Sequence, residues 1–167
     1  MTDALKLAEQ QLLAPGGLSH TDLEKVLHHL MGPSVDAGDL YFQNTTHEAW
    51  SLEDGLVRSG THAVEQGVGI RAMSGEKTGF AYADEIIMPS LMQASTAARA
   101  IARQGSQGSV QAWRQHHPQA LYLPDDPMPV LSADEKVDLL RQIDTYTRSL
   151  DPKVKQVMVS LAATHET

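Results

Sequence analysis

The sequence predicts an α+β fold in which an antiparallel sheet packs with about four helices. Residues 39–53 and 56–73 show the period-2 alternation of apolar side chains that is typical of half-buried strands. Between them, Asp54-Gly55 is a strong signal for a tight hairpin turn. Segments on either side carry apolar residues at helical spacing. We therefore expect a three-strand meander, a further strand near the C-terminus, and helices packed with this sheet.

The composition indicates one α+β domain over residues 1–167, because 41% of the side chains are hydrophobic and 20% are charged. No cysteine is present, which excludes a disulfide framework, a thiolate nucleophile and a cysteine-based zinc site. A formal net charge of −8 disfavours nucleic acid as a partner, since phosphates need a Lys and Arg footprint. The sequence shows neither a signal-peptide pattern nor a long apolar run, so we expect a cytoplasmic protein without a membrane partner.

Two helices are expected before the sheet. Leu5, Ala8 and Leu12 have helical spacing, and the breakers at residues 15–17 end this first helix. The second helix has a clear apolar stripe, and Thr21 with Glu24 has the spacing of a capping box. The stripe comprises Leu23, Val26, Leu27, Leu30 and Met31.

The sheet is predicted in three consecutive strands. Over residues 39–53 the even positions are apolar, and residues 44–46 are a candidate bend or bulge. The partner strand, residues 56–73, also has its apolar residues at even positions, and Gly67 and Gly69 within it indicate a bulge or a close approach. Residues 78–83 form the third strand, after a short polar turn.

The C-terminal half is predicted as helix, loop, helix and strand. Pro89 suits the first turn of a helix that ends before Gly105. Residues 105–131 form a long Gly/Pro-rich loop. Ser132 with Glu135 is a capping box for a helix that ends at residue 151. The alternating residues 157–163 then indicate the last strand.

No motif in the chain supports catalytic, metal-binding or cofactor-binding residues. His47-Glu48 lacks a second histidine at helical spacing, because Ser51 and Leu52 occupy those positions. His28 and His29 are adjacent on the predicted second helix and therefore do not converge easily on one metal ion. The pair His116-His117 lacks a carboxylate or cysteine at ligand spacing. Residues 75–78 superficially match a phosphate-binding loop, but Glu76 would repel phosphate and a strand follows.

Three short sequence segments resemble those of a known protein family. They are the predicted hairpin at residues 66–84, residues 38–43 (Gly-Asp-Leu-Tyr-Phe-Gln) and residues 52–55 (Leu-Glu-Asp-Gly). The chain resembles the N-terminal domain of the TldD/PmbA (TldE) family of metal-dependent peptidases. This resemblance implies an N-terminal α+β domain followed by a C-terminal region with the zinc ligands and the peptide cleft. It also implies a PmbA/TldE-like partner subunit, or self-association, and unfolded or leader-bearing peptides as substrates.

The family's zinc signature, His-Glu-x-x-x-His, is absent from these residues. The resemblance therefore implies a non-catalytic N-terminal domain of a longer chain, although a naturally short protein is an alternative. Arg71, Glu76, Lys77 and Tyr82 lie at or beside the predicted hairpin turn, and we predict that they contact another domain or subunit. An ordinary solvated turn with Tyr82 in the core is the competing interpretation.

A second hypothesis is a stand-alone module that binds a protein or peptide without enzymatic activity. It rests on the final strand, residues 153–164, which could leave an exposed edge.

Overall fold

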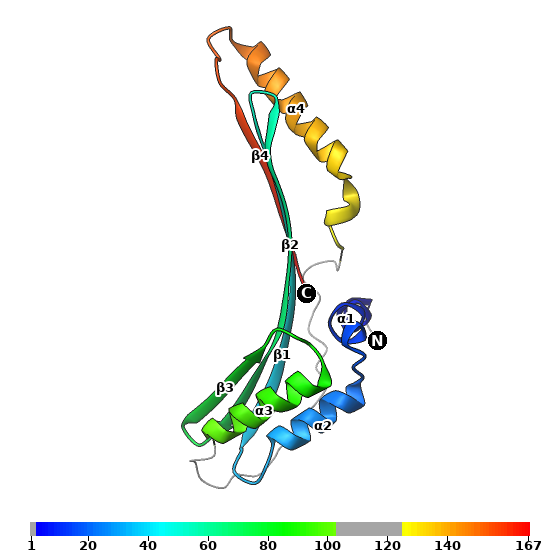
Figure 1. The fold of residues 1–167 in the computed structure, drawn as a ribbon, viewed down its shortest axis with the longest axis vertical. Helices are drawn as coiled ribbons and strands as arrows, with labels where there is room; N and C mark the ends of the chain where they lie inside the picture. Colours follow the sequence, from blue (N-terminus) through cyan, green and yellow to red (C-terminus); the bar gives the residue numbers. More distant parts are fainter. Residues whose placement is uncertain (1–2, 103–124) are drawn as a thin grey trace. The chain divides into compact units, whose positions relative to one another are not determined.

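The computed structural model describes residues 3–102 and 125–167, and it confirms the predicted α+β class. Four strands form one sheet in the order β3-β2-β1-β4 (Figure 1). The strands are β1 (Ala37–Glu53), β2 (Leu56–Ser74), β3 (Lys77–Ala83) and β4 (Met158–Glu166). The α-helices are α1 (Asp3–Ala8), α2 (His20–Leu30), α3 (Met88–Ala102) and α4 (Ala133–Leu150). Short helical turns are η1 (Glu9–Leu13), η2 (Ala14–Gly16) and η3 (Met128–Val130).

The chain divides into two compact units. Of the described residues, unit 1 comprises 3–44, 66–102 and Thr167, and unit 2 comprises 45–65 and 125–166. The long strands β1 and β2 therefore contribute residues to both units. That residues 1–167 form a single domain stays a prediction. Most of the predicted loop at 105–131 lies outside the described residues, and its last part contains η3.

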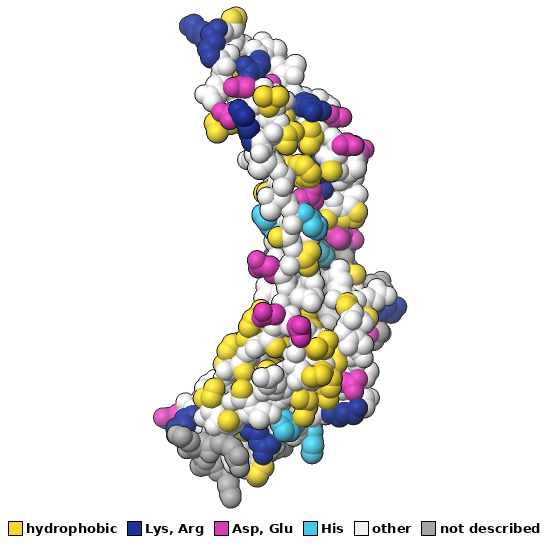
Figure 2. All heavy atoms as spheres, viewed as in Figure 1, with side chains coloured by type: hydrophobic (Ala, Val, Ile, Leu, Met, Phe, Trp, Pro, Cys, Tyr) yellow, Lys and Arg dark blue, Asp and Glu magenta, His cyan; other side chains and the backbone are white. Residues whose placement is uncertain are grey.

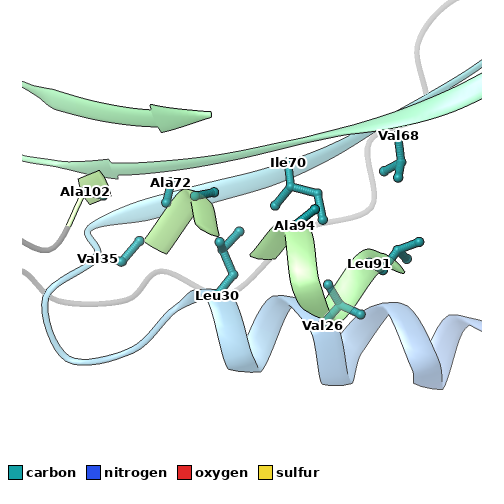
Figure 3. Packing of buried hydrophobic residues seen from close by; sticks show 10 residues of the cluster. Val26, Leu30, Val35, Val68, Ile70, Ala72, Leu91, Ala94 and Ala102 are labelled. Carbon is teal, nitrogen blue, oxygen red and sulfur yellow. The ribbon is translucent and has the colours of Figure 1, made fainter. Parts of the chain in front are cut away.

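The core of unit 1 lies between the strands and the helices α2 and α3. Figure 3 shows Val26 and Leu30 of α2 and Leu91 and Ala94 of α3 gathered below the strand that carries Ile70. The buried residues of β2 are the alternating Val68, Ile70 and Ala72. The predicted apolar face of this strand is therefore confirmed in unit 1, whereas the even-numbered Val64 of unit 2 is exposed.

β3 and α3 approach each other closely at Gly79. A Cβ added to this glycine would lie 2.0 Å from the backbone oxygen of Ala98. Gly79 and Ala98 are both buried, so the absence of large side chains lets the strand and the helix touch through their backbones. The small buried residues Ala94, Ala98 and Ala102 of α3 suit that contact.

The start of α2 differs from the prediction. Ser19, not Thr21, is the N-cap, and its side chain accepts a hydrogen bond from the Asp22 amide, while the Asp22 carboxylate accepts one from the Ser19 amide. The capping box therefore begins two residues earlier than Thr21-Glu24 because Gly17, with φ of +66°, ends the preceding turn early enough for the helix to start at His20.

The strand ladders are more regular than the sequence suggested. β1 pairs with β4 without interruption from Thr45 opposite Glu166 to Glu53 opposite Met158. Residues 44–46 therefore continue β1 instead of forming a bend. The β2–β3 ladder is also unbroken, from Val68 opposite Ala83 to Ser74 opposite Lys77, so Gly69 marks no bulge within it. Gly67 precedes this ladder.

Unit 2 contains the predicted tight turn and the predicted cap of α4. Asp54 and Gly55 both have positive φ, 49° and 77°, as the mirror-image hairpin turns require. Ser132 caps α4 with Glu135 in the expected reciprocal pattern. The Arg148 guanidinium near the end of α4 contacts the carboxylates of Asp54 and Asp144, which ties the helix to the hairpin turn.

Candidate interaction surface

The outward face of the β1–β2–β3 sheet in unit 1 carries three exposed aromatic side chains. Tyr41, Phe80 and Tyr82 are 60%, 58% and 61% exposed. On β3 the small residue Gly79 faces α3, so the alternation of the strand turns Phe80 and Tyr82 to the other face. Tyr41 follows the same logic, because its neighbours on β1 pack against the core. We call Tyr41, Arg71, Phe80 and Tyr82 the aromatic surface.

The rings of β3 lie over glycines of β2. A Cβ added to Gly67 would lie 2.6 Å from the Tyr82 ring, and one added to Gly69 would lie 3.0 Å from the Phe80 ring. Both glycines are buried although they belong to the outward face. This arrangement, in which an aromatic ring covers a neighbouring-strand glycine, stabilises glycine within a sheet. The close approach predicted for Gly67 and Gly69 is therefore made by aromatic rings.

An ion pair lies on the same face as the rings. The Arg71 guanidinium donates to one Asp39 carboxylate oxygen through Nε at 2.9 Å and Nη2 at 2.6 Å. Both side chains are nearly half exposed, so the pair adds less than about 1 kcal/mol to stability. It does hold the guanidinium in place on β2. The surface thus combines fixed aromatic rings with an oriented cation.

The structure separates the four residues predicted for contacts. Arg71 and Tyr82 lie on one face, because Ile70 and Ala72 beside Arg71 point into the core. Glu76 lies in the β2–β3 turn, and Lys77 begins β3 with the parity of the α3-facing Gly79. The competing interpretation is wrong in placing Tyr82 in the core, because this side chain is exposed. Its other part, an ordinary solvated turn, stays open, since Glu76 and Lys77 are exposed.

Sequence reasoning did not select Tyr41 and Phe80 for this surface. The available signal was the size of their neighbours: Gly79 and Ala81 are the small residues that suit a close helix, which leaves Phe80 for the outward face. Tyr41 alternates in the same way with the core-packed Leu40 and Phe42. On β3, the alternation of large residues with small ones would have predicted which side chains lie on the outward face of the sheet.

A buried polar cluster occupies unit 2. The Lys136 ammonium of α4 donates to the Glu48 carboxylate of β1 at 2.7 Å and to the Met128 backbone oxygen at 2.9 Å. The indole N–H of Trp50 donates to the other Glu48 oxygen. Hydrogen bonds from Lys136, and secondly from Trp50, hold the pKa of Glu48 below its ordinary value. Glu48 therefore serves as an ion-pair partner within the fold.

His47 and Glu48 do not converge. His47 Nδ1 lies 3.1 Å from the Thr164 hydroxyl of β4, whereas Glu48 points to α4. This divergence follows from the strand conformation, in which neighbouring side chains leave opposite faces. His29 contacts the Thr96 hydroxyl at 3.0 Å. His116-His117 lies outside the described residues.

In residues 3–102 and 125–167, no three His, Asp or Glu side chains are grouped so that they could hold a metal ion. These residues do not fit the zinc site that the family resemblance implies, and that the whole chain holds no such site stays a prediction. None of the helices in this part of the chain has the length and apolar character needed to span a bilayer.

Unit 2 has an exposed apolar side of its own. Figure 2 shows hydrophobic side chains over β3 and α3 and also over α4. On α4 the exposed residues recur with helical spacing, and Tyr146 is 65% exposed. The other members are Leu139, Ile143 and Leu150. Tyr146 offers a comparison for Tyr82 and Tyr41, because all three are exposed to a similar degree.

Comparison with known proteins defines the class to which this fold belongs. Residues 38–102 match the family described as PmbA/TldA metallopeptidase domain 1. The chain is 38% identical to a metalloprotease TldD homolog of Haemophilus influenzae, over 97% of this chain and 34% of that protein. Two solved structures are similar in fold at low identity. One is a proposed modulator of DNA gyrase from Bacteroides thetaiotaomicron (TM-score 0.66, 14% identity, 87% of this chain and 34% of that one). The other is TldE from Thermococcus kodakarensis (TM-score 0.58, 17% identity, 87% and 34%).

The matched segment contains the whole aromatic surface and the core residues that β2 and α3 supply, whereas Val26, Leu30 and Val35 of the same core precede it. The matched segment, residues 38–102, corresponds to the first domain of a metallopeptidase family. The chain belongs to the TldD/PmbA family, as the three short sequence segments indicated. It spans about a third of the length of the curated relatives that it matches.

Proposed function

We propose that this chain is the non-catalytic N-terminal domain of a TldD-like metallopeptidase that acts in proteolysis or peptide maturation. One observation carries the proposal: the chain aligns over nearly its whole length with only a third of a metalloprotease TldD homolog. The zinc that the resemblance implies would then be held by residues in the rest of the parent protein. This domain would help to enclose the substrate chamber and would make subunit contacts, in the cytoplasm.

The proposed partner is a PmbA/TldE-like subunit, and the proposed substrates of the parent are unfolded or leader-bearing peptides. The aromatic surface supports a subunit contact, because Tyr and Arg side chains are frequent hot spots of protein interfaces. The rings lie on a regular sheet, so little conformational freedom is lost when they are covered. Of the predicted contact residues, Arg71 and Tyr82 belong to this surface, and Glu76 and Lys77 would contribute at its margin.

The proposal is tested by mixing the purified chain with a PmbA/TldE-like subunit and measuring complex formation by sedimentation velocity. We expect a complex, and we expect no zinc-dependent peptide cleavage by the chain alone. Tyr41→Ser should weaken the complex, because it removes an exposed ring that covers no glycine. Tyr146→Ser removes a ring of similar exposure from unit 2 and should leave binding unchanged. Cleavage by the purified chain with zinc would overturn the non-catalytic role.

The stand-alone interaction module is the second candidate, and the position of β4 at the end of the sheet order favours it. The same experiment separates the two. A chain that binds an extended peptide along β4 but forms no complex with a PmbA/TldE-like subunit would support the module.

A further inference from the structure

Within unit 2, residues 56–65 of β2 form an open strand edge. β1 lies on one side of this segment, but β3 pairs with β2 only between Val68 and Ser74. Among the described residues no other strand pairs with residues 56–65. Every side chain in this segment except Ala63 is exposed. A strand edge of this length presents a row of backbone N–H and C=O groups that another strand can pair with.

The sequence of this edge is nearly a chemical palindrome about Gly60. Reading outward from the glycine, hydroxyl-bearing residues come first, then nitrogen-bearing residues, and then two apolar positions on each side. The matched pairs are Ser59 with Thr61, Arg58 with His62, Val57 with Ala63, and Leu56 with Val64. The outermost residues Leu56 and Val64 are 62% and 56% exposed, and Val57 is 42% exposed.

We propose that this edge pairs antiparallel with the same edge of a second copy of the chain, about a two-fold axis at Gly60. In that register Leu56 faces the partner's Val64, and Val57 faces the partner's Ala63. Both apolar contacts occur twice, once at each end of the paired segment. In this register odd-numbered residues lie opposite odd-numbered residues of the partner, and even-numbered opposite even-numbered. The backbone N–H and C=O groups that point away from β1 can therefore bond to those of the partner, and the side chains of each opposed pair lie on the same face of the joined sheet.

The local contacts fit this pairing. The Arg58 guanidinium donates to the Glu53 carboxylate at 3.0 Å, so its charge is balanced where two copies would meet. Its planar group can also stack on the ring of the partner's His62. Gly60 lies at the axis with the Trp50 ring beside it, because an added Cβ would be 2.7 Å from that ring. The indole of Trp50 is thereby part of the surface near the axis.

The proposed contact is isologous, because the same strand edge of both copies takes part in it. An edge used by its own two-fold copy leaves no second edge of the same kind, so the product is a dimer and not a fibre. Because a single pair of strands buries little area, we expect a weak dimer that dissociates on dilution. This inference concerns unit 2 and does not depend on the proposed function, which rests on the aromatic surface of unit 1.

Sedimentation equilibrium of the chain over a range of concentrations tests the dimer. We expect a monomer–dimer equilibrium whose dissociation constant rises about tenfold or more in Val64→Lys, because the charge would lie against the partner's Leu56. Met158→Lys is the matched control, since Met158 is an exposed apolar strand residue of unit 2 on β4. A monomer at every concentration would overturn the proposal. An equal or larger effect of Met158→Lys would also overturn it, because it would place the contact at β4.

Disulfide trapping tests the register in a chain that has no cysteine of its own. Ser59→Cys and Thr61→Cys chains should form a mixed disulfide dimer under mild oxidation, because these positions face each other across the axis. Either variant alone should cross-link far less, since identical positions are then displaced by two residues along the strands. Mixed and unmixed samples that cross-link to the same extent would contradict the register at Gly60.

Discussion

The Lys136 ammonium on α4 lies 2.7 Å from the Glu48 carboxylate on β1, and each side chain is only 10% exposed. These residues are 88 positions apart in the sequence. The Trp50 indole and the Met128 carbonyl complete the hydrogen bonding of the pair. Such a buried pair is costly to break, because the remaining charge keeps its desolvation penalty without a partner. The pair therefore fixes how α4 packs on β1 within unit 2.

Lys136→Met should lower the free energy of unfolding by about 3 kcal/mol, because it leaves the Glu48 carboxylate buried without its cation. Urea unfolding monitored by circular dichroism measures this change. Arg141→Met is the control on the same helix, since Arg141 pairs with Asp138 at the surface and should contribute less than about 1 kcal/mol. Adding Glu48→Gln to Lys136→Met should recover part of the loss. Equal effects of the two single substitutions would refute a structural role for the buried pair.

Stability should fall in acid through carboxylates of unit 2. The pKa of Glu48 is lowered from 4.5, chiefly by the hydrogen bond from Lys136, and the pKa of Asp54 is lowered from 3.8, chiefly by the hydrogen bond from the Val157 amide. Groups with a depressed pKa in the folded state stabilise it fully above the unfolded pKa and lose this effect as the pH falls through the folded value. We expect a plateau above about pH 5 and a decline below it.

The measurement is the unfolding free energy as a function of pH, with Glu48→Gln as the comparison. This variant should be less stable at neutral pH and should show a shallower decline in acid. An unchanged slope would mean that Glu48 does not contribute to the acid sensitivity.

Gly79→Ala should destabilise unit 1 by about 2 kcal/mol, because the new Cβ would meet backbone of α3 that cannot rotate away. Thr78→Ala, an exposed neighbour on the same strand, should have little effect. Thermal unfolding of both variants measures the difference. If Gly79→Ala is as stable as the parent, the close approach of β3 and α3 does not require a glycine at this position.

The predicted contact residues should separate into two groups in binding to a PmbA/TldE-like subunit. Arg71→Ala and Tyr82→Ser remove parts of one face and should weaken binding about tenfold each. Glu76→Ala and Lys77→Ala lie off that face, so each should change binding less than about threefold. Isothermal titration gives the affinities, and unfolding temperatures identify any variant that has lost its fold. If Glu76→Ala and Lys77→Ala weakened binding more than Arg71→Ala and Tyr82→Ser, the contact would lie at the hairpin turn and not on the aromatic surface.

Local patterns predicted much of the fold. Alternation identified the buried face of β2, and Ser132 with Glu135 identified the start of α4, because both signals depend on residues close in sequence. The N-cap of α2 was misplaced because Thr21 and Ser19 have equally plausible spacing, and the preceding turn decides between them. The pairing of Glu48 with Lys136 depends on tertiary packing that no local pattern encodes. Tyr82 had no clear direction until the close contact at Gly79 fixed the inward face of β3.

The central claim is that the aromatic surface of unit 1 is a subunit contact of a TldD-like metallopeptidase. Hydrogen–deuterium exchange tests it most directly, by comparing the chain alone with the chain bound to a PmbA/TldE-like subunit. We predict slower exchange in residues 39–43, 67–71 and 78–82 on binding, with α4 unchanged. A complex that forms without protection of these three segments would contradict the claim.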